Sequence, residues 1–193
     1  MPFASGPSPS YRQVMIFIDG GHLRKYLEEK WQSDEISGNG LQELTFELLG
    51  HVRFGNVVGE LIRTYYYDAI VGEDERELRQ KQNESFRRLH IPFCTVRLGR
   101  LKKTEKEGHR QKGVDILMAI DMLTKAYENH YDIAIVVAGD DDFVDLIEAV
   151  KDAGKRVLGA FIPGRVSEKF MQSLDVQIPL SESTLRKLVS QAR

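Results

Sequence analysis

Aspartate side chains follow two apolar segments of this sequence. Asp19 comes directly after residues 14–18, and three consecutive aspartates at 140–142 come shortly after residues 133–137. Both segments have the length and the unbroken apolar character of strands that are buried on both faces of a parallel sheet. Because ligand sites in such sheets lie beyond the carboxyl ends of the strands, we expect these carboxylates to gather at one edge of the sheet.

Carboxylates gathered at one edge favour a divalent cation between them. Two carboxylates about 4 Å apart repel by roughly 1 kcal/mol in water and by about 4 kcal/mol at an effective dielectric constant of about 20. Oxygen ligands suit Mg²⁺ or Mn²⁺ better than zinc. The competing interpretation is helix capping, in which aspartate accepts a backbone N–H bond. Three aspartates exceed the needs of a cap, so Asp140, Asp141 and Asp142 favour the metal site, whereas Asp19 alone fits either interpretation.

Two further aspartates lie in a segment with helical spacing, which begins at Val114. The apolar residues that share one predicted helical face, expected to be the buried face, are Ile116, Ile120, Leu123 and Tyr127. Asp115 lies about 100° from Ile116, on the rim of that face, where it either reaches the crevice or supports the start of the helix. Asp121 lies about a third of a turn around the helix and ~9 Å further along its axis, which makes it a weaker candidate.

Other chemistries find less support in the sequence. His22 could serve as a base or a ligand, but a lone histidine after a strand is more often structural. The run Tyr65-Tyr-Tyr67 could stack bases, yet aromatic residues inside a predicted strand more often belong to the core. No second aspartate follows Asp19 two residues on, as aspartyl-phosphate phosphatases require, and no glycine-rich dinucleotide or P-loop pattern follows a strand.

Length and composition indicate one globular domain. The chain has 193 residues, of which 41% are hydrophobic and 29% charged. Cys94 is the only cysteine, which excludes an internal disulfide and a cysteine-based zinc site and fits the cytoplasm. We find neither a signal peptide nor a membrane span, so residues 1–12 are expected to form a flexible tail before a domain over residues 13–193. A homo-oligomer is neither indicated nor excluded.

Positive charge is concentrated in residues 97–112. The whole chain has a net charge of −2 and an isoelectric point near 6.2, so any affinity for a polyanion must come from a local patch. This segment is predicted to be a loop or a short hairpin, and its only acidic residues are Glu105 and Glu107. The residues there that would contact a polyanion, such as RNA, are Arg97, Arg100, Lys102, Lys103, Arg110 and Lys112.

Predicted strands and helices alternate along the chain. The predicted strands are residues 14–18, 61–70, 92–98, 133–137 and 156–161. The predicted helices are residues 22–30, 41–49, 74–89, 114–127, 143–153, 167–174 and 183–191. This order is typical of right-handed βαβ units, which predicts an α/β domain with a mostly parallel, doubly wound sheet.

Taken together, three ordered motifs resemble the NYN domain family, the PIN-like nucleases that include the LabA-like bacterial proteins. The first is Phe17-Ile-Asp-Gly20 with Leu23, and the second is Lys112-Gly-Val-Asp115 with Asp121. The third is Ala138-Gly-Asp-Asp-Asp-Phe143, followed by Gly154-Lys-Arg-Val157. The similarity spans residues 14–161. One departure is His22, where the family usually carries asparagine.

The resemblance implies a single PIN-like domain with helices on both faces of its sheet. It also implies a metal-dependent endoribonuclease that hydrolyses RNA phosphodiester bonds with Mg²⁺ or Mn²⁺. The residues it assigns to metal binding and catalysis are Asp19, Asp115, Asp140 and Asp142. We expect His22, Asp121 and Asp141 to support those ligands. Two alternatives stay open: a catalytically silent RNA-binding or scaffold module, and a metal-dependent hydrolase of small nucleotides.

Overall fold

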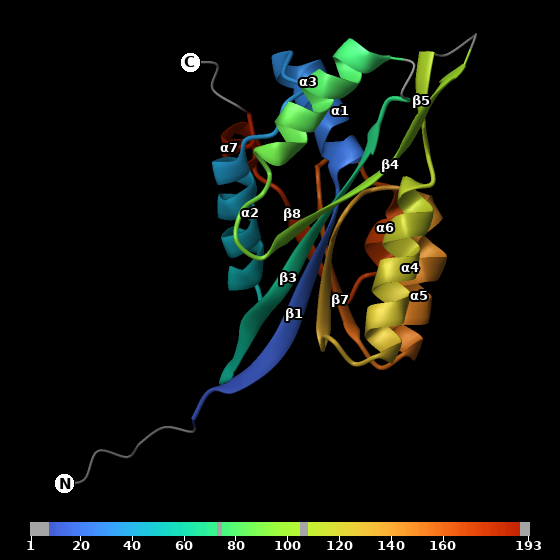
Figure 1. Ribbon diagram of the computed structural model, residues 1–193. Coiled ribbons are helices and arrows are strands. Elements are labelled where there is room, and N and C mark those ends of the chain that lie inside the picture. Colours follow the sequence, from blue (N-terminus) through green and yellow to red (C-terminus); the bar gives the residue numbers. More distant parts are fainter. Residues whose placement is uncertain (1–7, 73–74, 105–107, 190–193) are drawn as a thin grey trace, which may run out of the picture.

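A sheet of eight strands runs through the described part of the computed structural model, residues 8–72, 75–104 and 108–189 (Figure 1). For residues 102–104 and 108–112 only the backbone is described. The strands are β1 (Ser10–Asp19), β2 (Arg53–Phe54), β3 (Val57–Ile70), β4 (Cys94–Thr104), β5 (Gly108–Lys112), β6 (Ile133–Val137), β7 (Arg156–Phe161) and β8 (Val176–Pro179). Their order is β5-β4-β3-β1-β6-β7-β8, and β2 pairs with β3. Among these pairings only β2–β3 and β4–β5 are antiparallel, which confirms a mostly parallel α/β sheet.

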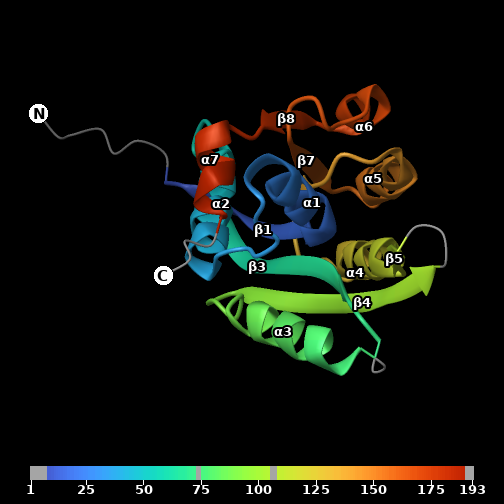
Figure 2. The same cartoon turned by 90° about the horizontal axis from the view of Figure 1, so that it is seen from above.

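Helices cover both faces of the sheet, as Figures 1 and 2 show. The helices are α1 (Gly20–Trp31), α2 (Gly38–Gly50), α3 (Arg76–Arg87), α4 (Val114–Tyr127), α5 (Val144–Asp152), α6 (Glu168–Ser173), α7 (Glu182–Lys187) and the 3₁₀ turn η1 (Asp141–Phe143). Helices α1, α2, α3 and α7 contribute to one apolar core, and α4, α5 and α6 contribute to the other. The sheet therefore separates two cores.

Strand β1 supplies both cores because successive side chains of a strand point to opposite faces. Val14, Ile16 and Ile18 enter the core of α1 and α2, while Met15 and Phe17 enter the core of α4 and α5. The three tyrosines of β3 alternate in the same way, with Tyr66 on the first side and Tyr65 and Tyr67 on the second. Their burial confirms the prediction that this aromatic run belongs to the core.

The connections of the sheet reverse direction between β1 and β6. From β1 the chain builds β3 and β4 on one side, and it then returns to place β6 on the other side of β1. Such a reversal opens a crevice beyond the carboxyl ends of the two strands. Asp19 ends β1, and Asp140 follows β6 by three residues, so both aspartates lie beside this crevice.

The buried face of α4 differs from the predicted one. Ile116, Ile120 and Tyr127 were expected to face the core, but they are 65%, 56% and 69% exposed. The residues that α4 buries instead are Val114, Met118, Asp121, Met122 and Ala126. The helix carries two apolar stripes, and the stripe that packs on the sheet is the one that contains Asp121. That carboxylate accepts hydrogen bonds from Tyr67 on β3 and Arg97 on β4, so it holds this face of the helix against the sheet.

Strand β1 and helix α7 are the first and last named elements of the described chain. Strand β1 begins at Ser10, inside the stretch of residues 1–12 that was expected to be a tail, and residues 1–7 lie outside the described residues. The last helix, expected over residues 183–191, is α7, and residues 190–193 are not described. The predicted hairpin of the basic segment corresponds to β4 and β5. No helix in the described ranges is long and apolar enough to cross a membrane.

Candidate functional site

Asp19 stands where β1 becomes α1. Its carboxylate caps the helix by accepting the backbone N–H of His22 at 3.0 Å. Burial, together with the carboxylates of Asp115 and Asp68, raises the pKa of Asp19 to about 6, although the hydrogen bond from His22 opposes the shift. The capping role and the site role therefore coexist at Asp19.

Gly20 allows the chain to turn into α1 directly over the sheet. A Cβ atom at this position would lie 2.1 Å from the ring of Tyr66, which is fully buried beneath it. A larger residue would push the start of α1 away from the strand. The Asp-Gly pair therefore sets the position of the Asp19 carboxylate above the sheet.

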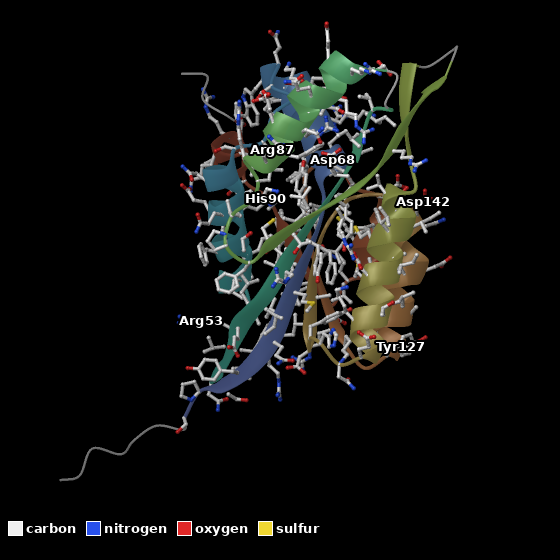
Figure 3. All side chains as sticks on the ribbon, in the orientation of Figure 1. Arg53, Asp68, Arg87, His90, Tyr127 and Asp142 are labelled. Carbon is white, nitrogen blue, oxygen red and sulfur yellow. The ribbon has the colours of Figure 1, made fainter. Side chains whose placement is uncertain are left out.

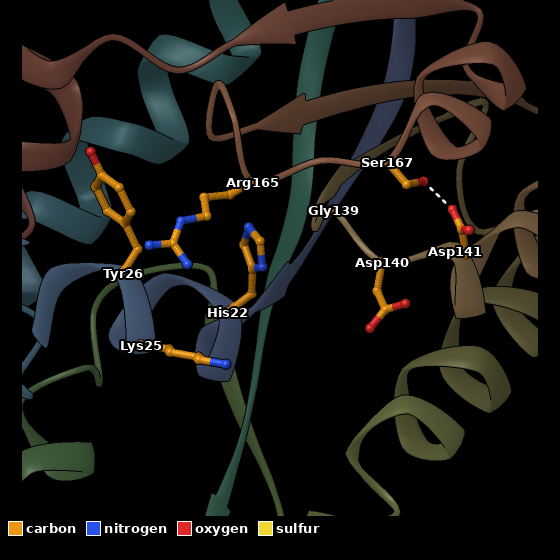
Figure 4. A pocket seen from close by; sticks show the side chains of 8 residues that line it. All are labelled: His22, Lys25, Tyr26, Gly139, Asp140, Asp141, Arg165 and Ser167. Atoms are coloured by element: carbon orange, nitrogen blue, oxygen red, sulfur yellow. Dashed lines mark hydrogen bonds between the residues drawn. The ribbon is translucent and has the colours of Figure 1, made fainter. Parts of the chain in front are cut away.

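Asp140, Asp141 and Asp142 occupy the turn between β6 and α5. Asp140 caps η1 by accepting the backbone N–H of Asp142 at 3.3 Å, and Figure 4 shows its carboxylate directed into the crevice. Asp141 instead accepts a hydrogen bond from the hydroxyl of Ser167, which ties this turn to the segment after β7. Asp140 and Asp141 therefore point in different directions, and Asp141 supports the turn.

Asp115 lies in the first turn of α4 and is exposed. Partial burial raises its pKa, and so do the neighbouring carboxylates of Asp142 and Asp140. The prediction that Asp115 lies beside the crevice rested on the wrong buried face, yet the electrostatic coupling places it near this acidic turn. In the described residues no three His, Cys, Asp or Glu side chains are grouped closely enough to hold a metal ion. The predicted aspartates thus share one region of the molecule without forming a closed cage.

Asp68 is an acidic residue of this edge that our sequence analysis missed. It is fully buried in β3, and Arg24 of α1 donates two hydrogen bonds to it, at 2.6 and 2.5 Å. The hydroxyl of Tyr66 and the backbone N–H of Ala69 complete its partners. The signal in the sequence was an acidic residue directly after the aromatic run of a predicted strand. Because Asp68 is fully paired, it orients Arg24 beside the crevice.

Asp121 does not belong to the cluster around Asp68. It lies on the opposite face of the sheet, between the sheet and α4. Burial opposes its ionisation, but hydrogen bonds from Arg97, Lys125 and Tyr67 outweigh that effect and hold the pKa of Asp121 below its usual value. Tyr67 and Arg97 are paired neighbours in β3 and β4, so both reach the same carboxylate. Arg97 remains 46% exposed although two of its nitrogens are bonded to Asp121. The side chains of Lys102, Lys103, Arg110 and Lys112 lie outside the described residues.

His22 separates two hollows beside the acidic edge. Its Nε2 atom is buried and has no hydrogen-bond partner among the described residues. Burial lowers the pKa of His22, although Asp140 opposes the shift, and the cations Arg165 and Lys25 lower it further. The imidazole is therefore neutral at pH 7. A Cβ atom at Gly139 would lie 3.0 Å from its ring and 2.4 Å from the carbonyl of Arg165, so only glycine fits between them.

The two hollows share three residues, His22, Lys25 and Asp140. One has a volume of about 330 Å³, and its lining, drawn in Figure 4, also contains Tyr26, Gly139, Asp141, Arg165 and Ser167. The other, of about 600 Å³, is also lined by Asp19, Gly21, Arg24, Glu28 and Leu101. Cationic side chains of α1 and of the segment after β7 thus face the carboxylates across the crevice. Such a site can bind a cation and a phosphate side by side.

The sequence of residues 13–181 matches the family model of the NYN domain. The chain therefore belongs to the NYN domain family, a nuclease-like family, as the three motifs indicated. The fold is similar to the crystal structure of a protein of unknown function from Vibrio parahaemolyticus RIMD 2210633, with a TM-score of 0.63 at 16% sequence identity. That match covers 93% of this chain and 96% of the other. No curated protein matches the sequence significantly.

Proposed function

We propose that this NYN domain is PIN-like and acts as a divalent-metal-dependent endoribonuclease. The observation that carries the proposal is electrostatic: burial and neighbouring carboxylates raise the pKa of Asp19 to about 6, and they raise the pKa of Asp115 as well. Ionised carboxylates held in this way repel one another at neutral pH, and a bound cation relieves that repulsion. The donor set consists of oxygen atoms, which fits Mg²⁺ or Mn²⁺.

The residues that would hold the cation are Asp19, Asp115, Asp140 and Asp142. When bound, the cation lowers the pKa of a water molecule and neutralises charge on the scissile phosphate. Lys25 and Arg165 line the same region and suit contacts with phosphate oxygens. The buried, neutral imidazole of His22 carries an unpaired nitrogen that a hydrogen-bonding group of the substrate or a water molecule would satisfy.

The basic β4–β5 hairpin supports a polymeric substrate rather than a small nucleotide. Arg100 is exposed on β4, and Lys102, Lys103, Arg110 and Lys112, also assigned to RNA binding, follow it along the hairpin. Phosphate contacts of this kind fix the position of a strand without reading its bases. We therefore propose that the hairpin holds RNA that flanks the scissile bond.

The open arrangement of the carboxylates favours one alternative. Because no group of three potential ligands in the described residues is closely placed, the chain could bind RNA without cleaving it. A catalytically silent RNA-binding module would retain affinity for RNA and would show neither metal dependence nor turnover. The two functions therefore differ in a cleavage assay.

The test compares cleavage of single-stranded RNA by the wild type and by two matched variants. The wild type is expected to cleave with Mg²⁺ or Mn²⁺ and to stop in chelator. Asp140→Asn should lower the rate by at least about a hundredfold, because loss of a supporting residue alone can cost a metal site that much. Asp152→Asn changes an exposed aspartate at the end of α5 and should leave the rate unchanged. Cleavage by Asp140→Asn at the wild-type rate would contradict the assigned site.

A further inference from the structure

Helix α3 presents a row of arginines to solvent. Arg76, Arg79, Asn83 and Arg87 recur at helical spacing and line one hollow of about 480 Å³ along the helix. From Arg76 to Arg87 this row is ~16 Å long at 1.5 Å per residue. The only residue that α3 buries is Phe86, so most of the helix surface is accessible to solvent.

These arginines have no ion-pair partner among the described residues. None of the ion pairs in the described part of the chain uses Arg76, Arg79 or Arg87, whereas Arg88, the next residue, is paired with Glu35. Glu84 is the only acidic side chain among those that line the hollow. In a protein whose net charge is −2, such a row concentrates positive potential on one face.

The row continues toward the acidic crevice. A second hollow, of about 560 Å³, lies between α3 and the ends of β3 and β4, and Arg79 and Asn83 line both hollows. Its lining also includes Arg100 and Leu101, and Leu101 is shared with the hollow that contains Asp19 and Asp140. Neighbouring hollows from the carboxylates to α3 therefore share lining residues at each step.

Hydrogen bonds hold α3 in place over this path. The side chain of Gln82 accepts the backbone N–H of Val71, and Arg79 donates to the carbonyl of the same residue. Both bonds fix the helix to the end of β3. Ile70, Leu98 and Leu101 contribute apolar surface to this hollow, on which a base can stack, and Arg79 and Arg100 contribute positive charge for phosphates.

We propose that α3 is an RNA-binding surface that guides a single strand away from the acidic crevice, with Arg76, Arg79 and Arg87 contacting consecutive stretches of its phosphate backbone. The inference rests on the proposed function for the identity of the polymer. It adds a contact surface outside the β4–β5 hairpin and the crevice. Neutral Gln80 and Asn83 within the row supply hydrogen bonds without adding charge.

The experiment measures RNA binding in chelator, so that cleavage plays no part. Fluorescence anisotropy of a labelled single-stranded RNA is followed over a salt titration for the wild type and for the double variant Arg76→Gln, Arg87→Gln. Both residues are exposed, so the fold should tolerate the change. The matched control is Arg53→Gln, Arg156→Gln, which removes equal charge near the amino ends of β3 and β7. Figure 3 shows Arg53 well below Arg87, near the start of β3.

Loss of two phosphate contacts should reduce the slope of log affinity against log salt by about 1.4 and weaken binding roughly twentyfold at about 0.1 M salt. The control should keep the wild-type slope. Equal losses in both variants, or unchanged binding by the α3 variant, would overturn the inference, as would a wild type that binds no RNA in chelator. If the α3 effect appears in a protein that never cleaves RNA, the nuclease proposal fails and the inference stands.

Discussion

Replacing Asp19 with asparagine is expected to stabilise the metal-free protein at neutral pH. Asparagine keeps an oxygen that can accept the N–H of His22, so the helix cap survives. What disappears is the free energy required to ionise a carboxyl group that is buried beside Asp115 and Asp68. Ionised Asp19, at the centre of the site, therefore lowers the free energy of unfolding of the protein.

The magnitude follows from the pKa of Asp19, which rises from 3.8 to about 6 on folding. Each pKa unit corresponds to about 1.4 kcal/mol, so ionised Asp19 destabilises the folded state by roughly 3 kcal/mol above pH 6. Between pH 3.8 and about 6 the folded state binds more protons than the unfolded state, and stability therefore falls as the pH rises through this window. Below pH 3.8, Asp19→Asn and the wild type should have the same free energy of unfolding.

Thermal unfolding in chelator across this pH range measures the effect. For a chain of this size about 3 kcal/mol corresponds to an increase in Tm of roughly 6–12 °C for Asp19→Asn at pH 7 to 8. Saturating Mn²⁺ should stabilise the wild type more than the variant and so reduce the difference in Tm between them. Asp152→Asn is the control and should match the wild type throughout. A lower Tm for Asp19→Asn at neutral pH, or a gap that does not change with pH, would refute the reasoning.

Two further predictions concern the other aspartates and the pH dependence of cleavage. Asp115→Asn should weaken Mn²⁺ binding in calorimetry with little change in Tm, whereas Asp121→Asn should keep metal affinity and lower the Tm by roughly 4–8 °C, because about 2 kcal/mol of hydrogen bonds to a buried charge is lost. Loss of metal affinity in Asp121→Asn, with a lower Tm in Asp115→Asn, would mean that Asp121 is the ligand and Asp115 the structural residue. The cleavage rate should fall as the pH drops through about 6, where Asp19 takes up its proton. The midpoint of this pH dependence should move to lower pH at higher Mn²⁺ concentration. A midpoint that does not depend on the Mn²⁺ concentration would count against Asp19 as a ligand.

The sequence was sufficient to predict where the acidic residues gather. Residues 14–18 and 133–137 are unbroken apolar runs, so their assignment as buried strands needed no knowledge of the rest of the fold. A parallel sheet brings the carboxyl ends of its strands to one edge, and that rule alone brought Asp19 and Asp140 together. Each strand was predicted from its own residues, and the relation between the two strand ends was predicted from the geometry of a parallel sheet.

Two features could not be predicted because they depend on pairs that are distant in sequence. Helix α4 has two apolar stripes, and the choice between them depends on Asp121 meeting Tyr67 and Arg97, which come from two other elements. The role of Asp68 depends on Arg24, which lies 44 residues earlier. A charged residue within a strand indicates that such a partner exists, but local periodicity does not identify it.

The central claim is that Asp19 and Asp140 bind the same divalent cation. The most direct measurement is a crystal structure of the protein soaked in Mn²⁺, with the metal located by its anomalous scattering. We expect one peak in the crevice between β1 and β6, coordinated by the carboxylates of both residues. Metal bound elsewhere on the protein, or an empty crevice at a Mn²⁺ concentration that supports cleavage of RNA in solution, would contradict the claim.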